Sequence, residues 1–220
     1  MANVLVEARE LSRSYGAGRS AVIAVREASC RILPGDRIAL VGPSGSGKST
    51  LLYLLARLEP PTSGTVLWPS LGAGDSPLPT FAGFVFQSPN LLSPLTAVEN
   101  VALPLLIADV PAERANEAAR LMLHSLELAD VSDRYADDLS GGQAERVGIA
   151  RALVSDPALV LADEPTGQLD GTTAARVIDR LLEATHRSGA AVIVATHDER
   201  IAARMRTRWS MDHGELDATR

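Results

Sequence analysis

The chain has 220 residues, of which 46% are hydrophobic and 22% are charged, and its formal net charge is −6. This length suits one domain, or one domain with a subdomain, and the composition is that of an ordinary globular protein. The acidic balance argues against a protein held to nucleic acid mainly by phosphate contacts. No apolar run approaches the roughly 20 residues of a membrane-spanning helix, and residues 1–10 show no secretion signal, so we expect a cytosolic protein.

The first part of the chain predicts two flanking strands, then a strand, a loop and a helix. Residues 4–11 and 22–33 are rich in β-branched side chains and predict an antiparallel flank. Cys30, the only cysteine, lies in this region and is expected to be an inert core residue. The apolar run 37–41 ends in a glycine-rich loop, and residues 48–58 predict a helix with leucines on one face.

The middle of the chain changes from loop to helix. Residues 69–80 contain three prolines and two glycines and predict a loop. A short strand is expected at 83–86. Residues 96–128 are helical in pattern, with one helix started by Pro111, and a further helix is predicted at 141–155.

The last part alternates buried strands with a helix. Residues 159–162 and 191–195 are continuous apolar runs, and residues 172–187 between them have the pattern of an amphipathic helix. Continuous apolar strands that alternate with helices imply a parallel sheet covered on both faces. We therefore expect an α/β fold in which a helical segment interrupts the core.

A phosphate-binding motif lies between the third expected strand and its helix. Residues 42–49 read Gly-Pro-Ser-Gly-Ser-Gly-Lys-Ser and match G-x-x-x-x-G-K-[ST]. Glycine lets backbone N–H groups turn inward around phosphate oxygens, and the following helix adds its positive dipole end. Lys48 should reach the β- and γ-phosphates, and the Ser49 hydroxyl should ligate Mg²⁺. The strand before and the helix after disfavour the alternative of a simple Gly-rich turn. The predicted nucleotide-binding residues of this loop are Gly42, Pro43, Ser44, Gly45, Ser46, Gly47, Lys48, Ser49 and Thr50.

Two carboxylates follow the buried strand at 159–162. The carboxyl end of a strand is where ligands sit in open α/β sheets. Asp163 can hold Mg²⁺ against the phosphates, directly or through water. Glu164 points elsewhere and could act as the general base that polarises an attacking water. An Asp-Glu pair alone would indicate only a polar turn, but the upstream phosphate loop favours a catalytic role.

Further motifs, in order along nearly the whole chain, resemble those of ATP-binding-cassette (ABC) ATPases. Residues 139–143, Leu-Ser-Gly-Gly-Gln, resemble the signature of that family. Residues 85–87 resemble the Q-loop, residues 167–170 the D-loop, and residues 195–198 the segment with the switch histidine. Tyr15 lies where the family has an aromatic ring that stacks on adenine. An unrelated phosphate-loop enzyme would lack the signature.

The resemblance implies a RecA-like P-loop core with a mainly parallel sheet, an antiparallel β flank and an inserted helical subdomain. One ABC ATPase domain would cover residues 1–220. Its core would comprise about residues 1–87 and 146–220, and its helical subdomain about residues 88–145.

The resemblance also implies roles for the remaining site residues. Gln87 would contact Mg²⁺ or the attacking water and report whether γ-phosphate is present. His197 would bind γ-phosphate and orient the water that Glu164 activates. Tyr15 would stack on adenine, although a single Tyr there could also serve only in packing.

Two copies of the chain are implied for each reaction. The signature opens a helix whose N–H groups suit an anion, but it belongs to the helical insertion, too far from the same chain's phosphate loop. The family solution is that each copy completes its partner's site, so a homodimer would hold two competent ATP sites. The residues assigned to that seam are Ser140, Gly141, Gly142, Gln143 and Asp170.

Two stretches, 99–105 and 162–170, resemble the lipoprotein-releasing and macrolide-exporter (LolD/MacB-type) branch. Such ATPases drive a permease in export or mechanotransmission. Here the permease, of FtsX/MacB-like type and present as two copies or two halves, would be a separate chain. The ATPase would then be peripheral on the inner face of the cell membrane, and residues 88–95 would be its docking surface.

Two other functions remain open at this point. The chain could be an FtsE-like ATPase that regulates a cell-wall hydrolase through its permease. A soluble ABC protein that acts on DNA or the ribosome is disfavoured, because such proteins generally have tandem cassettes, coiled-coil insertions or zinc motifs. The cargo cannot be inferred from the sequence.

Overall fold

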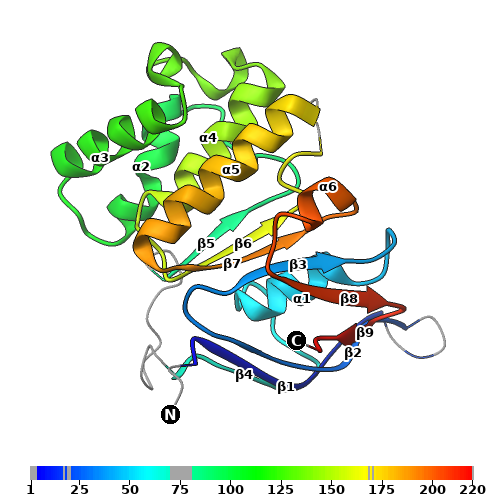
Figure 1. The fold of residues 1–220 in the computed structure, drawn as a ribbon. Helices are drawn as coiled ribbons and strands as arrows, with labels where there is room; N and C mark the ends of the chain where they lie inside the picture. The colour runs from blue at the N-terminus through cyan, green and yellow to red at the C-terminus, as the bar shows by residue number, and fades with distance from the viewer. Residues whose placement is uncertain are drawn as a thin grey trace. The chain divides into compact units, whose positions relative to one another are not determined.

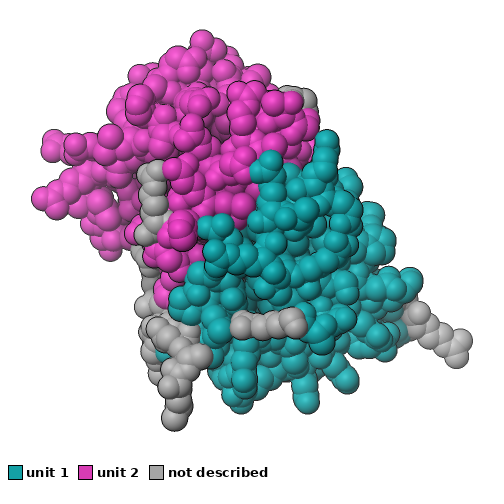
Figure 2. Space-filling view, in the orientation of Figure 1, with its two compact units in different colours: residues 1–76, 191–220 teal, residues 77–190 magenta. Residues whose placement is uncertain are grey.

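The computed structural model is an α/β structure whose elements follow the order shown in Figure 1. It divides into two compact units, described here one at a time: unit 1, residues 1–76 and 191–220, and unit 2, residues 77–190 (Figure 2). Nearly all of the expected loop 69–80 lies outside the described residues. Within the described ranges, no helix has both the length and the apolar character that crossing a bilayer requires. The structure describes residues 4–16, 18, 21–69, 81–167, 169 and 171–219, without the Arg187 side chain.

Unit 1 contains the expected antiparallel flank as a three-stranded sheet. Strands β1 (Val6–Tyr15), β2 (Val22–Ile32) and β4 (Ser63–Leu67) are hydrogen-bonded in the order β2-β1-β4. β1 pairs antiparallel with both neighbours, and Val6 faces Ile32 in the register. The two predicted strands are confirmed, whereas β4 is a strand that the sequence analysis did not predict.

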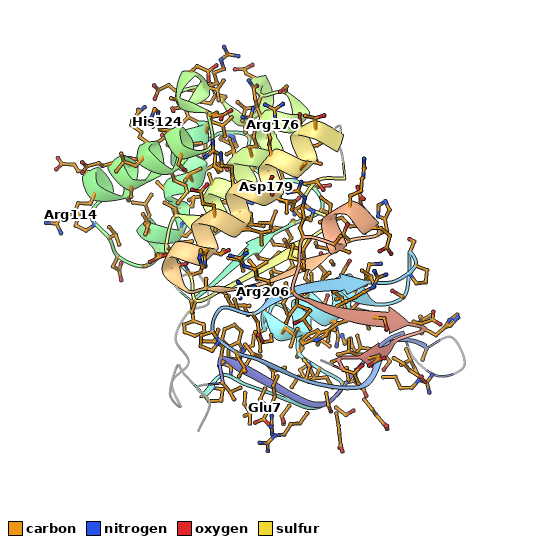
Figure 3. The ribbon with its side chains drawn as sticks, in the orientation of Figure 1. Glu7, Arg114, His124, Arg176, Asp179 and Arg206 are labelled. Carbon is orange, nitrogen blue, oxygen red and sulfur yellow. The ribbon has the colours of Figure 1, made fainter. Side chains whose placement is uncertain are left out.

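A group of charges links two strands of this sheet. Glu7, labelled in Figure 3, accepts hydrogen bonds from Arg9 Nη2 at 2.7 Å and from Arg31 Nε at 2.9 Å. These bonds hold the pKa of the Glu7 carboxyl below its ordinary value. Both arginine side chains are well exposed, so this group contributes little to stability.

The second strand set of unit 1 is mainly parallel. β7 (Ala191–Ala195), β3 (Arg37–Val41), β8 (Thr207–Asp212) and β9 (Glu215–Asp217) are hydrogen-bonded in that order. β3 runs parallel to both β7 and β8, and only the β8–β9 hairpin is antiparallel. The parallel arrangement expected from the apolar runs is confirmed, and the β8–β9 hairpin was not predicted.

The described part of unit 1 contains two helices that pack on its strands. α1 (Lys48–Leu55) ends three residues before the predicted end, and Arg57 beyond it has a positive φ of 54°. Four leucines of α1 are fully buried, each worth about 1.5–3 kcal/mol of transfer free energy. The short α6 (Glu199–Ala202) follows β7 and packs on β3.

The described residues of unit 2 form two parallel strands and four α-helices. β5 (Ala82–Val85) and β6 (Leu159–Asp163) are paired with Val85 opposite Ala162. The β6 residues 159–162 are fully buried, as their continuous apolar sequence predicts. The helices are α2 (Ala97–Ile107), α3 (Ala112–Ser125), α4 (Gly141–Leu153) and α5 (Gly171–Ser188), with short 3₁₀ turns at Ala129–Val131 and Ala136–Asp138.

The helical region predicted at 96–128 is two helices joined by a turn. Asp109 in this turn has a left-handed φ of 59°, and α3 begins directly after Pro111. α2 packs on both α3 and α4, and α4 packs on β5. The expected subdomain boundaries, about 88 and 145, remain a prediction. Unit 2 is a compact unit that includes β5 and β6 as well as the helices, because α4 packs on β5, so its limits do not test these boundaries.

Asn100 of α2 organises the segment that leads from β5 into the helices. Its side chain is fully buried. Its Oδ1 accepts from Leu92 N at 2.8 Å, and its Nδ2 lies 3.0–3.2 Å from the carbonyl oxygens of Leu92, Leu95 and Thr96. A buried amide with these partners satisfies backbone groups that no regular element pairs. The segment 88–96 is therefore an ordered loop rather than a loose connection.

Replacing this amide should destabilise unit 2. Asn100→Ala leaves buried backbone groups unpaired, and we expect it to lower the free energy of unfolding by about 2–3 kcal/mol. Asn116→Ala on α3, which removes an amide from a half-buried position, is the matched control and should cost under about 0.5 kcal/mol. Urea unfolding of both variants measures this, and equal effects would contradict the role given to Asn100.

Candidate functional site

The glycine-rich loop connects β3 to α1 in unit 1, in the strand-loop-helix order that its motif requires. Lys48 is only 8% exposed, and its Nζ donates to the carbonyl oxygens of Gly42 at 2.8 Å and Pro43 at 2.9 Å. These bonds hold the ammonium group against the loop itself. The Ser46 Oγ is buried and has no hydrogen-bond partner among the described residues.

The loop can take this shape only because glycine stands where other backbone segments approach it. A Cβ at Gly47, where φ is 104°, would collide with the carbonyl oxygen of Ala24 on β2. A Cβ at Gly42 would collide with the carbonyl oxygen of Met211 on β8. The turn of the β8–β9 hairpin also supports the loop, since Gly214 N donates to Ser46 O at 3.0 Å. The unpredicted hairpin is thus part of the site's framework.

His197 lies close to the start of this loop. β3 and β7 are parallel neighbours, and Thr196 N donates to Leu40 O at 3.1 Å. His197 therefore leaves its strand beside the residues that lead into the phosphate loop, and its side chain is exposed. The next residue, Asp198, caps α6, and its hydrogen bonds with Arg200 hold the pKa of the carboxyl at about 2. Because the Asp198 carboxylate stays charged, its hydrogen bonds at the start of α6 fix the backbone directly after His197.

Tyr15, at the end of β1, is 38% exposed. The Arg13 guanidinium lies 4.8 Å from the centre of its ring, and its hydroxyl donates to Glu59 Oε2 at 2.6 Å. The ring is therefore held in place at one face and at its tip. Stacking of adenine on Tyr15 remains a prediction.

Unit 2 brings three other predicted residues to one sheet edge. Because Val85 faces Ala162 in the parallel β5–β6 pair, Gln87, Asp163 and Glu164 leave the strands at the same end. Asp163 is 1% exposed, Glu164 is half-buried and Gln87 is exposed. Glu164 has a left-handed φ of 46°, which is uncommon for a residue with a Cβ and ends the extended backbone directly after Asp163.

The signature forms the start of α4 in the same unit. Ser140 is the N-cap: its Oγ accepts from Gln143 N at 3.4 Å, while Gln143 Oε1 accepts from Ser140 N at 2.9 Å. This reciprocal pair is a capping box. The neighbouring Gly142 is half-buried, and a Cβ there would lie 3.0 Å from Leu169 Cδ2, so the signature and the D-loop are adjacent. Asp170 itself lies outside the described residues.

The residues of each unit suit the ligands expected of them. The loop of unit 1 offers a buried ammonium, an unpartnered buried hydroxyl and glycine positions that keep its backbone open to phosphate oxygens. Ser49, on the first turn of α1, has the hydroxyl that Mg²⁺ accepts as a ligand. Asp163 and Gln87 supply oxygen ligands of the same hard type from the sheet edge of unit 2. ATP with Mg²⁺ therefore fits the chemistry of these donor sets.

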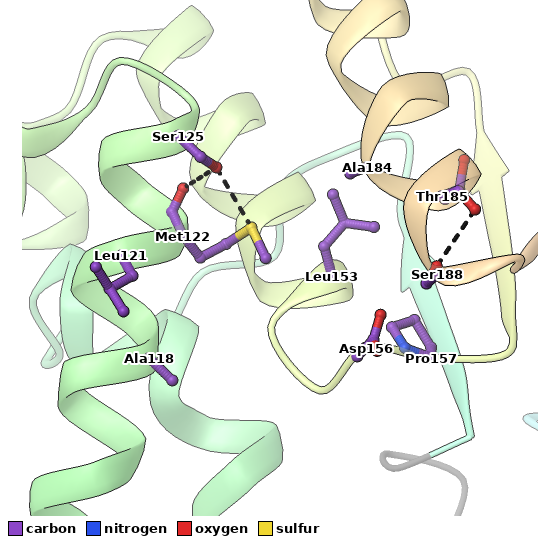
Figure 4. A pocket seen from close by; sticks show the side chains of 10 residues that line it. All are labelled: Ala118, Leu121, Met122, Ser125, Leu153, Asp156, Pro157, Ala184, Thr185 and Ser188. Carbon is purple, nitrogen blue, oxygen red and sulfur yellow. Dashed lines mark hydrogen bonds between the residues drawn. The ribbon is translucent and has the colours of Figure 1, made fainter.

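A pocket of about 390 Å³ lies elsewhere in unit 2, between α3, the end of α4 and the end of α5 (Figure 4). Leu121, Met122 and Leu153 make much of its lining apolar. No predicted site residue lines it. Its concave shape therefore does not mark the position of the predicted nucleotide-binding residues.

Comparison with known proteins agrees with this geometry. A model of the ABC transporter family matches residues 25–167. The chain belongs to this family. It is 42% identical over 225 residues to the lipoprotein-releasing system ATP-binding protein LolD of Legionella pneumophila (strain Paris), an alignment that covers 99% of each chain. It is 44% identical to LolD 2 of Rhodospirillum rubrum over 220 residues, 96% of this chain and 95% of the relative.

Solved ABC structures share the fold. The cassette MJ0796, solved as a dimer in a post-hydrolysis state with ADP and Pi, is 33% identical in sequence to this chain. The two structures superpose with a TM-score of 0.87, and the match covers 98% of this chain and 99% of that one. CbiO1 of Clostridium perfringens, part of the CbiONQ transporter complex, is 27% identical with a TM-score of 0.82, over 98% and 87% of the two chains. The chain is thus an ABC ATPase of LolD type, and the predicted α/β fold and ATPase activity are confirmed.

Several supporting residues were not predicted from the sequence. Gly214 supports the phosphate loop through the unpredicted hairpin, and Asn100 orders the loop after Gln87. Arg151 of α4 binds the same loop. The His-Gly turn at 213–214 was a usable hairpin signal, but an amide or an arginine within a helix carries no signal of the backbone it will contact.

A side chain at Gly47 should disturb the phosphate loop. Gly47→Ala should weaken ATP binding by about 100-fold or more, equivalent to roughly 3 kcal/mol, because the loop must move away from Ala24. Gly189→Ala is the matched control: its φ of 73° is also left-handed, but no atom lies within 4 Å of the added Cβ. The control should cost about 1 kcal/mol of stability and leave the ATP affinity unchanged. Equilibrium titration with a fluorescent ATP analogue compares them, and equal affinities would refute the argument.

Proposed function

We propose that this chain is the ATPase subunit of a lipoprotein-releasing type export complex, in which two copies enclose Mg-ATP and drive a separate permease in the membrane. The observation that carries the proposal is the full-length similarity to lipoprotein-releasing ATP-binding proteins, 42% identical over 99% of both chains. A second copy is supported by the dimeric MJ0796 structures. The chain would then lie on the cytoplasmic face of the membrane, bound through residues 88–95 to a permease of FtsX/MacB-like type.

Each predicted residue has a chemical task in this reaction. Lys48 and the backbone N–H groups of residues 42–49 bind the phosphates and offset their charge. Ser49, Asp163 and Gln87 are the candidate Mg²⁺ ligands, and the ion, when bound, neutralises charge that develops on the phosphates. Glu164 accepts a proton from the attacking water, and His197 orients that water beside the γ-phosphate.

The proposal assigns the signature to the nucleotide of the other copy. Ser140 and Gly142 lie at the N-terminus of α4, a 13-residue helix. The first N–H groups of a helix have no partner within the helix, and those of Gly141 and Gly142, which the capping box does not use, are the proposed anion donors. The Ser140 hydroxyl already accepts one bond within its capping box, and it retains a proton that it can donate to a γ-phosphate oxygen. Asp170 is proposed to cross the same seam.

Removing the proposed base should trap the complex. Glu164→Gln keeps the size of the side chain but cannot accept the proton, so turnover should fall by about 1,000-fold or more. With Mg-ATP the variant should be a stable dimer by size-exclusion chromatography with light scattering, and it should remain bound to its permease in detergent-solubilised membranes. Turnover near the wild-type rate would remove Glu164 as the base. If no membrane protein co-purified with the ATP-trapped dimer, the proposal that the chain drives a permease would be contradicted.

The trans role of Ser140 can be separated from its capping role. Ser140→Asn retains a good N-cap, so α4 should remain stable. It loses the hydroxyl proposed to bind γ-phosphate, and we expect turnover to fall by about 10–100-fold. Thermal unfolding and steady-state ATPase assays measure the two effects. Undiminished turnover would show that the signature does not bind the reacting phosphate.

A further inference from the structure

Arg151 lies near the end of α4 and binds the loop that follows Gln87. Its Nη2 donates to Pro89 O at 2.8 Å, and its Nη1 donates to Asn90 O at 2.9 Å. The side chain is half-buried, and burial lowers the pKa of the guanidinium. Charge-assisted bonds from a desolvated guanidinium are stronger than ordinary neutral ones. The contact is therefore a firm link between α4 and the loop 88–96.

α4 also approaches this loop through its backbone. A Cβ at Gly148, three residues before Arg151, would lie 3.6 Å from Pro89 O and 3.7 Å from Pro89 Cα. α4 thus runs close to Pro89 one turn before Arg151, with room beside Gly148 for little more than a methyl group. Gly148 and Arg151 are three residues apart and therefore lie on the same face of α4, so this face is the one that packs beside Pro89.

The other side of the signature is tied to the same loop. The Ser93 hydroxyl donates to Asp137 Oδ1 at 2.7 Å, and Ala136 N donates to Leu95 O at 3.1 Å. Both partners, Asp137 and Ala136, belong to the short 3₁₀ turn Ala136–Asp138, which leads into the signature at 139–143. The loop 88–96 therefore contacts the chain just before the signature and again near the far end of the helix that the signature begins.

We propose that Arg151 is a positioning residue that makes the loop 88–96 and the signature helix α4 move as one body. α4 is a continuous helix of 13 residues, so a displacement of the loop is carried along its axis to Ser140. Gln87 directly precedes the loop, so its position depends on the same contact between the loop and α4. Arg151 thus couples the position of the proposed Q-loop ligand to that of the proposed γ-phosphate donor.

The bidentate geometry explains why arginine is required. Its planar fork reaches two successive carbonyl oxygens at once, whereas a lysine ammonium is a single flexible point charge. The use of this link by a membrane partner rests on the function proposed above. The link itself is a property of the single chain.

The test compares Arg151→Met, Arg151→Lys and wild type as isolated full-length chains. Arg151→Met should lower kcat by about tenfold, the factor that corresponds to 1.4 kcal/mol, with KM for ATP within about twofold. A small change in KM is expected because the phosphate loop belongs to unit 1. Amide hydrogen exchange should rise at residues 88–95 and also at 136–143, which precede or begin the helix and lie far from Arg151 in sequence. Arg151→Lys should restore part of kcat.

Arg120→Gln is the matched control. Arg120 also makes two hydrogen bonds, at 2.6 and 3.3 Å, but to the exposed Asp133 carboxylate, and its loss should leave kcat and exchange at 136–143 unchanged. The proposal is overturned if Arg151→Met matches this control, or if it raises exchange at 88–95 alone. It is also overturned if Arg151→Met lowers kcat and raises KM by the same factor while the whole protein loses stability. If no membrane protein changed the ATPase rate of the wild-type chain, the proposed permease partner would be contradicted. The comparison of the Arg151 variants would remain valid, because it uses the isolated chain.

Discussion

The close approach of three backbone segments around the phosphate loop is the constraint on which unit 1 depends. The loop leaves β3, and the carbonyl oxygens of Ala24 and Met211 press on it at Gly47 and Gly42, where a side chain cannot fit. The hairpin turn at Gly214 adds a hydrogen bond to Ser46. A loop confined on these sides keeps its N–H groups in fixed positions, so little reorganisation is needed when phosphate binds. The confinement thus connects the glycines of the motif with the chemistry expected of Lys48.

Unit 2 uses a different kind of constraint. Its predicted groups are at the ends of rigid elements: Gln87 and Glu164 follow two paired strands, and Ser140 begins a helix. The loop 88–96 is held by side chains rather than by regular backbone pairing, with Asn100 binding one part and Arg151 another. Side-chain clamps of this kind can order a segment while leaving its outer face exposed, as Leu92 is at 50%. An exposed but ordered loop is well suited to transmit force between proteins.

Elements whose pattern lies within a few consecutive residues were predicted from the sequence, and elements without such a pattern were not. The leucines of α1 and the apolar residues of β6 and α5 were recognised because their periodicity is a property of a few consecutive residues. β4 and the β8–β9 hairpin were missed because their sequences mix polar with apolar residues and contain no continuous apolar run. β4 and β9 are also edge strands, which need no such run. Within the helical region 96–128 the start of a helix at Pro111 was predicted, whereas the left-handed turn at Asp109 that follows the preceding helix was not.

The residues by themselves determined the chemistry, because the glycine-rich loop, the Asp163-Glu164 pair and the signature are contiguous motifs whose function depends on local spacing. They also determined the family, since the motifs occur in one order along the chain. Only the tertiary structure decided which backbone groups support these motifs. Ala24, Met211 and Pro89 act through carbonyl oxygens, which every residue type has, so their sequence carries no trace of the role. The contacts of Arg151 join residues 61 and 62 positions apart in the sequence, which folding alone brings within hydrogen-bonding distance.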